Sequence, residues 1–162
     1  EGRASGHAQL TGQGQRRMGV KNRGYMEGEK KLQMSEQRIE QLCGSETILH
    51  IEDEPTIRQT VATILARMRY VVLEAETGEA GLAIYQERAC DIDLVLLDLG
   101  LPDQWGGEVF SQLRAIDPQV KVVVFTGIQG PERNLEGMQA LLEKPVRLVT
   151  LLQTVRTVLD TE

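Results

Sequence analysis

The sequence predicts an α/β fold in which five parallel strands form one doubly wound sheet, a (βα)5 arrangement. Short apolar runs of strand length alternate with longer stretches whose apolar residues recur at helical spacing. The run at residues 94–97 is wholly apolar, as expected of a strand buried on both faces. Strands that alternate with helices form a parallel sheet, because each crossover carries a helix over one face of it.

The elements follow in order from residue 47. Strands are expected at 47–51, 70–75, 94–97, 120–126 and 140–143. Helices are expected from Pro55, from Gly78 to about Arg88, and over about 107–116, 131–138 and 147–159. Pro55 suits the first turn of a helix, where its missing N–H would have no helical partner.

Helical periodicity also predicts which side chains face the core. In the first helix these are Ile57, Val61, Ile64, Leu65 and Met68. In the third they are Phe110, Leu113 and Ile116. In the last they are Leu148, Leu151, Leu152, Val155 and Leu159.

Residues 1–46 are expected to be a disordered or linker segment that precedes a domain of residues 47–162. Seven of the sixteen glycines fall within residues 1–28, where apolar residues are few. Over residues 29–42, the spacing of Leu32, Ile39 and Leu42 predicts a short helix or the end of a longer one. Two heptads are too few to indicate a coiled coil.

Composition narrows the class of protein. The 162 residues carry a net charge of -6, divided as +2 over residues 1–47 and -8 over the remainder. An acidic domain disfavours nucleic acid as a direct partner. The sequence has neither an apolar run long enough to span a membrane nor a secretory signal, so we expect a cytoplasmic protein without a membrane partner.

Polar residues stand where four of the predicted strands end. Glu52 and Asp53 follow the first strand, Asp98 follows the third, Thr126 ends the fourth, and Lys144 follows the fifth. The carboxyl ends of parallel strands share one edge of the sheet, where ligands bind in such folds. We therefore expect these side chains to meet.

Their chemistry suggests a Mg²⁺-dependent phosphoryl acceptor. Neighbouring carboxylates raise one another's pKa unless a cation compensates, and oxygen ligands suit Mg²⁺. An aspartate such as Asp98 can attack phosphorus to form an aspartyl phosphate. Lys144 and Thr126 would then contact the phosphoryl oxygens as a charge and a hydrogen-bond donor.

The motifs ILHIEDEP, LVLLDLGLPD, VVVFTG and EKP, in this order and spacing, resemble the receiver domain of bacterial response regulators. The resemblance extends over about residues 47–160 and implies the flavodoxin-like receiver fold. It implies that Glu52 and Asp53 are the acidic metal-binding pair and that Asp98 is the phosphoacceptor.

The resemblance also makes the carbonyl of Gly100 the third protein ligand of Mg²⁺, with Thr126 and Lys144 as the family's hydroxyl and lysine. The Lys144–Pro145 bond is expected to be cis.

The implied function is phosphoacceptor signalling in a two-component system. Asp98 would take its phosphoryl group from a phosphohistidine, on a histidine kinase or a histidine phosphotransfer protein, and so switch contact with an output protein that the sequence does not identify. The domain would catalyse only its own phosphorylation and dephosphorylation. It would be either a stand-alone receiver or one excised from a hybrid sensor kinase.

Two features depart from the family's pattern. Leu141 stands three residues before Lys144, where the family commonly has an aromatic switch residue. Thr126 and Lys144 are several residues closer together than usual, which shortens the fourth loop or helix. Both departures concern output rather than phosphorylation.

Two other functions share part of this pattern. A haloacid-dehalogenase-like phosphatase requires a second aspartate two residues after the first, and this position is Gly100. A phosphate-independent interaction module would be expected to lack one of the acids, the threonine or the lysine. His50 lies within a predicted strand and is expected to be a packed histidine rather than a phosphohistidine.

Overall fold

The structure is a computed structural model that describes residues 38–127 and 135–161. Its strands are β1 (Thr47–Ile51), β2 (Val71–Ala75), β3 (Leu94–Leu97), β4 (Val122–Thr126) and β5 (Ala140–Glu143). Its helices are α2 (Pro55–Arg67), α3 (Gly78–Arg88), the short 3₁₀ helix η1 (Ala89–Asp91), α4 (Gly106–Ile116) and α5 (Leu148–Asp160).

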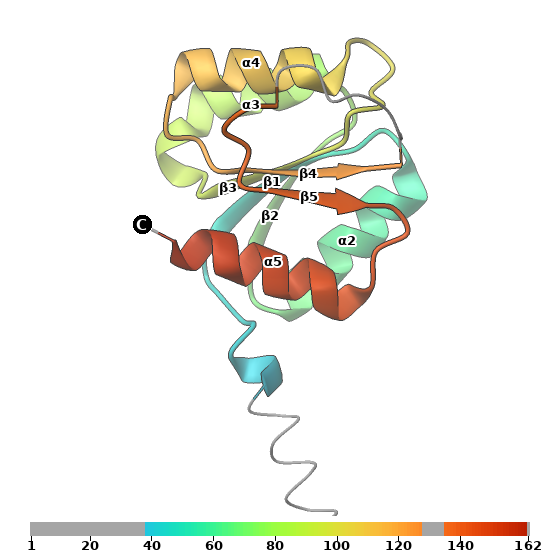
Figure 1. The fold of residues 1–162 in the computed structure, drawn as a ribbon, viewed down its shortest axis with the longest axis vertical. Coiled ribbons are helices and arrows are strands. Elements are labelled where there is room, and N and C mark those ends of the chain that lie inside the picture. The colour runs from blue at the N-terminus through green and yellow to red at the C-terminus, as the bar shows by residue number, and fades with distance from the viewer. Residues whose placement is uncertain (1–37, 128–134, 162) are drawn as a thin grey trace, which may run out of the picture. The chain divides into compact units, whose positions relative to one another are not determined.

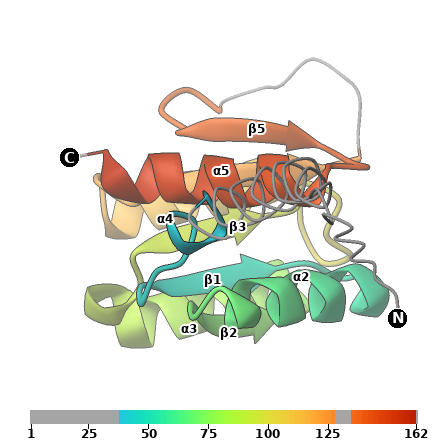
Figure 2. The same cartoon turned by 90° about the horizontal axis from the view of Figure 1, so that it is seen from below.

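The five strands form one parallel sheet in the order β2-β1-β3-β4-β5. Figure 2 shows β5 and β2 at opposite edges. The order reverses between β1 and β3, because the chain moves from β1 outward to β2 and then returns to the other side. This topology confirms the predicted fold class and places a ligand crevice at the carboxyl ends of β1 and β3.

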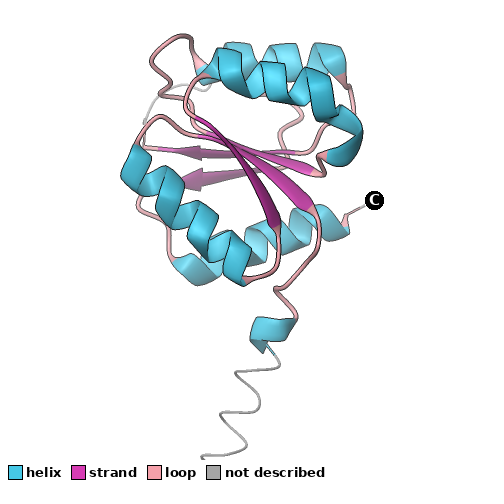
Figure 3. Cartoon of the chain, turned by 180° about the vertical axis from the view of Figure 1, so that it is seen from behind, coloured by secondary structure: helices cyan, strands magenta, loops and turns pink. Residues whose placement is uncertain are grey.

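Helices cover both faces of the sheet. Helices α3 and α4 lie on one face and α2 and α5 on the other (Figure 1), and the view from behind shows the same layers (Figure 3). Side chains alternate between the two cores: Leu49 and Ile51 of β1 pack toward α3 and α4, whereas Ile48 packs toward α2 and α5. All four residues of β3 are fully buried, as predicted.

Local sequence explains where the helices begin. The Glu54 side chain accepts from Thr56 N–H at the start of α2, and Pro55 takes the first helical position. The Thr77 hydroxyl caps α3 by accepting from Ala80 N–H. Among the helices of the described ranges, none is long and apolar enough to cross a bilayer.

Several predicted details differ from the structure. Ile116, the last residue of α4, and Leu148, the first residue of α5, are 39% and 49% exposed, whereas Val158, which the pattern did not select, is buried. Strands β2 and β4 begin one and two residues later than predicted.

The predicted helix at 131–138 lies largely outside the described residues, and 135–138 form a turn. Of the predicted helix at 29–42, only 38–42 is described, and it holds one helical turn at 38–40. The division between a linker of residues 1–46 and a domain of residues 47–162 remains a prediction.

Candidate functional site

Neighbouring strands bring the predicted carboxylates together. In the pairing of β1 with β3, Ile51 lies opposite Leu97, so the residues that follow them, Glu52 and Asp98, are side by side. The ladder continues one step further, where Asp98 N–H donates to the carbonyl of Ile51 at 3.0 Å. Carboxylate oxygens of Glu52, Asp53 and Asp98 all lie within 4.8 Å of one another. Glu52 and Asp98 are buried, whereas Asp53 is exposed.

Lys144 reaches this cluster from the end of β5. Its Nζ lies 2.6 Å from Glu52 Oε2 and 2.6 Å from Asp98 Oδ2. The same ammonium lies 4.9 Å from the ring centre of Phe125, a cation–π contact. Lys144 is therefore a cation that compensates the neighbouring acids, and its bond to Pro145 is cis, as the resemblance implied.

Backbone geometry positions the acceptor and the hydroxyl. Asp98 Oδ1 accepts from Gly100 N–H at 3.1 Å while Oδ2 contacts Lys144, so both carboxylate oxygens are held. Thr126 is buried at the end of β4, and its carbonyl accepts from Lys144 N–H at 2.8 Å. These contacts bring Asp98, Gly100, Thr126 and Lys144 to the same end of the sheet.

Burial controls the electrostatics of Glu52. Desolvation raises the pKa of its carboxyl, the hydrogen bond and charge of Lys144 oppose that effect, and the charge of Asp98 adds to it. Glu52 Oε1 is buried and has no hydrogen-bond partner among the residues that the structure describes. A buried carboxylate oxygen without a donor is a position that a cation would satisfy.

The set of donors fits Mg²⁺. Glu52 offers an unpartnered carboxylate oxygen, Asp53 offers an exposed carboxylate, and both lie beside Asp98. Few protein oxygens, with one side open to water, match an ion that keeps several water ligands. The role predicted for the Gly100 carbonyl remains a prediction.

Two residues whose roles the sequence did not indicate, Asp103 and Arg58, hold the loops of the site. The Asp103 carboxylate accepts from Gly78 N–H and from Glu79 N–H, both at 2.9 Å, and so joins the loop after β3 to the start of α3. These bonds lower the pKa of Asp103 against the opposing effect of desolvation, which is the largest single influence. Arg58 contacts the turn after β1. A capping acid 25 residues from its helix has no local sequence signal.

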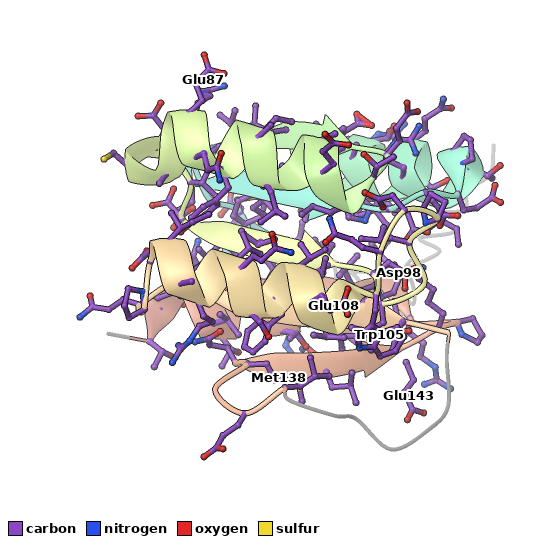
Figure 4. All side chains as sticks on the ribbon, turned by 90° about the horizontal axis from the view of Figure 1, so that it is seen from above. Glu87, Asp98, Trp105, Glu108, Met138 and Glu143 are labelled. Carbon is purple, nitrogen blue, oxygen red and sulfur yellow. The ribbon has the colours of Figure 1, made fainter. Side chains whose placement is uncertain are left out.

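Trp105 lies in the same loop as Asp103. Figure 4 shows Trp105 and Asp98 at the same end of the domain. Trp105 is 37% exposed and is the single tryptophan of the chain. It is therefore placed to report changes at this end of the sheet by its fluorescence.

His50 is a core residue, as predicted. It is fully buried in β1, and neither ring nitrogen has a hydrogen-bond partner among the described residues. Desolvation, followed by the charges of Lys144 and Arg58, lowers its pKa to about 3. The imidazole is therefore neutral at physiological pH.

Comparisons with known proteins point to one family. The family model described as the response regulator receiver domain matches residues 48–156. The sensor kinase CckA of Brucella abortus (strain 2308) is 32% identical over 123 residues, which are 74% of this chain and 13% of that protein. The cell cycle response regulator CtrA of Brucella ovis is 32% identical over 91 residues, which are 56% of this chain and 38% of that protein. The matched region therefore spans well under half the length of either relative.

Solved structures agree with these matches. A CheY-like receiver domain protein from Methanospirillum hungatei JF-1 is 29% identical, with a TM-score of 0.65 over 72% of this chain and 95% of that one. The receiver domain of the hybrid histidine kinase CckA is 32% identical, with a TM-score of 0.62 over 70% of this chain and 99% of that one. Both support the predicted fold.

Proposed function

Because this chain belongs to the response regulator receiver family, we propose that Asp98 accepts a phosphoryl group from a phosphohistidine with Mg²⁺ bound beside it. The observation that carries the proposal is the arrangement of the strand ends. Three carboxylates lie within 4.8 Å of one another, and one ammonium contacts two of them at 2.6 Å. The domain is a two-component signalling domain, and its cycle is one of phosphorylation and dephosphorylation of its own aspartate.

The transfer is a substitution at phosphorus. A carboxylate oxygen of Asp98 forms the new P–O bond while the P–N bond of the phosphohistidine breaks, and its electron pair goes to the imidazole nitrogen. Lys144 then meets the transferred oxygens as a charge, and the Thr126 hydroxyl donates to them. The N–H of Gly100 holds the carboxylate in its orientation during the attack.

The metal would be held by Glu52, Asp53, Asp98 and the Gly100 carbonyl. When bound, Mg²⁺ supplies positive charge that neutralises the phosphoryl oxygens. Glu52 contributes the unpartnered Oε1, and Asp53 contributes a carboxylate that is open to solvent. Glu52 is buried, so its geometry is fixed, whereas Asp53 can move to accommodate the ion.

The partners that we propose are a histidine kinase or a histidine phosphotransfer protein as the donor, and an output protein. The support is that the relatives include a sensor kinase and a cell cycle response regulator. The phosphatase alternative is disfavoured, because Gly100 lacks a side chain that could act as acid or base on a leaving group.

Intact-protein mass spectrometry tests the proposal. The protein is incubated with phosphoramidate, whose P–N bond resembles that of a phosphohistidine, in the presence of Mg²⁺ or of a chelator. We expect the mass of one phosphoryl group to be added with Mg²⁺, and none to be added in Asp98→Asn. Asp91→Asn is the matched control, because Asp91 is an exposed aspartate in η1 that forms a surface ion pair with Arg88. Equal labelling of Asp98→Asn and wild type, or no labelling of wild type, would overturn the assignment.

A further inference from the structure

We propose that Arg58 is a positioning residue for the acidic metal site, because its guanidinium fixes the turn that carries Glu52 and Asp53. The proposal rests on the proposed function, since that function requires Mg²⁺ at these acids. Arg58 lies on α2, a helix with no predicted role in the chemistry. Its guanidinium contacts the backbone carbonyls of the two acidic residues rather than their carboxylates.

The contacts of Arg58 are directed at the two acidic residues. Its Nη1 donates to the carbonyl of Glu52 at 2.7 Å and to the carbonyl of Asp53 at 3.1 Å. Glu52 N–H donates to the carbonyl of Ala75 at 3.0 Å on the other side. The turn is therefore held between β2 and the guanidinium, and each of its two peptide carbonyls has a charged donor.

The guanidinium is itself held in place. Its Nε lies 4.0 Å from Glu74 Oε2 and its Nη2 lies 3.7 Å from Glu76 Oε2. The Arg58 side chain is only 14% exposed, whereas those of Glu74 and Glu76 are 39% and 74% exposed. Ion pairs this long and this exposed contribute little energy, so the hydrogen bonds to the two carbonyls are the stronger restraint. The two glutamates add only a weak orienting interaction with the guanidinium.

Arg58 can influence a bound cation in two ways of opposite sign. Its positive charge repels Mg²⁺, so removal of the charge alone would tighten Mg²⁺ binding. Its hydrogen bonds hold the turn that aims both carboxylates, so their removal would weaken Mg²⁺ binding. Mutation of a group that hydrogen-bonds to metal-binding residues and orients them typically lowers metal affinity by ~10- to 100-fold. If Arg58 positions the acids, its loss must weaken binding despite the relief of repulsion.

Three variants separate these effects. Arg58→Met removes both the charge and the donors. Arg58→Lys keeps the charge, but its single ammonium replaces a guanidinium that contacts the two carbonyls through Nη1 while Nε and Nη2 face Glu74 and Glu76. Arg67→Met is the matched control, because Arg67 is an exposed arginine in the last turn of the same helix.

The measurement is a Mg²⁺ titration of the folded proteins by isothermal calorimetry, with the fluorescence of Trp105 as a second signal. Thermal melts in chelator confirm that each variant is folded at the titration temperature. We expect Arg58→Met and Arg58→Lys each to weaken Mg²⁺ affinity by about tenfold. We expect Arg67→Met to change the affinity by less than about twofold, because surface charges this far away are screened.

The possible failures are distinguishable. If Arg58→Met binds Mg²⁺ more tightly and Arg58→Lys is unchanged, Arg58 acts only through its charge and the inference is wrong. If the variants lose thermal stability while their affinity matches that of wild type, Arg58 is merely structural and the inference is again wrong. If wild type itself binds no Mg²⁺, the proposed function fails as well, a result that the first two outcomes do not produce.

Discussion

Replacement of Lys144 by methionine should destabilise the metal-free domain by an amount that grows with pH. Lys144 Nζ contacts Glu52 and Asp98 at 2.6 Å each, and the exposed fractions of their side chains are only 1% and 8%. Methionine keeps an unbranched stem that can pack near Phe125, so the principal loss is the charge. Removal of one partner from a buried ion pair typically costs ~3–5 kcal/mol.

Protonation of a carboxylate limits how much stability Lys144→Met can lose. Without Lys144, the raised pKa of Glu52 rises further, and a proton bound by Glu52 relieves the repulsion between the two neighbouring carboxylates. From an ordinary carboxyl pKa of 4.5, binding that proton costs at most ~3.4 kcal/mol at pH 7 and ~1.4 kcal/mol at pH 5.5. When a carboxyl has a raised pKa in the folded state, the free energy of unfolding of the protein falls as pH rises from 4.5 toward the raised value. The defect should therefore shrink on acidification.

Urea denaturation followed by circular dichroism, in chelator at pH 5.5 and pH 7, measures the effect. We expect Lys144→Met to lose ~2–3 kcal/mol at pH 7 and less than about 1.5 kcal/mol at pH 5.5. Millimolar Mg²⁺ should recover part of the loss, because a second cation then compensates the acids. An equal loss at both pH values, or no loss at pH 7, would refute the electrostatic reasoning.

Three further predictions concern other residues. The stability of wild type relative to His50→Leu should fall by up to ~2 kcal/mol between pH 6.5 and pH 5 in urea titrations, because the folded-state pKa of about 3 makes the unfolded chain bind the extra proton. Asp103→Ala removes two hydrogen bonds from backbone N–H groups at the start of α3. In urea titrations it should lower the free energy of unfolding by about 1 kcal/mol, with Asp91→Ala as a neutral control. Leu141 is half-buried against the α3–α4 core, so beryllofluoride with Mg²⁺ should shift amide resonances near Asp98 and Thr126 more than those of Leu141. Leu141→Ala should still accept a phosphoryl group, and loss of acceptance would contradict the expectation that Leu141 concerns output rather than phosphorylation.

The fold, and the meeting of the acids and the lysine at one edge of the sheet, were predictable from the pattern of apolar runs. Apolar runs locate the strands, and the residue after each run lies at the carboxyl edge of the sheet, which is why the meeting of Asp98 with Lys144 could be predicted. Ile116 and Leu148 were wrongly predicted to face the core. Both are terminal residues of their helices, α4 and α5. Periodicity gives the face of a helix, but it does not show how far along that face the core extends.

Longer-range contacts carry no such signal. Arg58 follows an ordinary surface pattern in the sequence, and only the folded chain shows that its guanidinium turns back to the carbonyls of Glu52 and Asp53. The same holds for Asp103, whose carboxylate caps a helix 25 residues earlier in the chain. Long polar side chains can reach many places from one backbone position, so their partners depend on the tertiary structure.

Under the proposed function, the contacts of Glu52 predict a link between metal binding and phosphorylation. In the structure, one ammonium compensates both Glu52 and Asp98, and Glu52 Oε1 has no hydrogen-bond partner among the described residues. A phosphoryl group on Asp98 adds negative charge that also requires Lys144. If Lys144 turned to the phosphoryl oxygens alone, Glu52 would become an uncompensated buried acid, with the cost worked out above for Lys144→Met. A divalent cation on Glu52 removes that cost, so bound Mg²⁺ and the aspartyl phosphate should stabilise each other, because linkage between two sites is reciprocal.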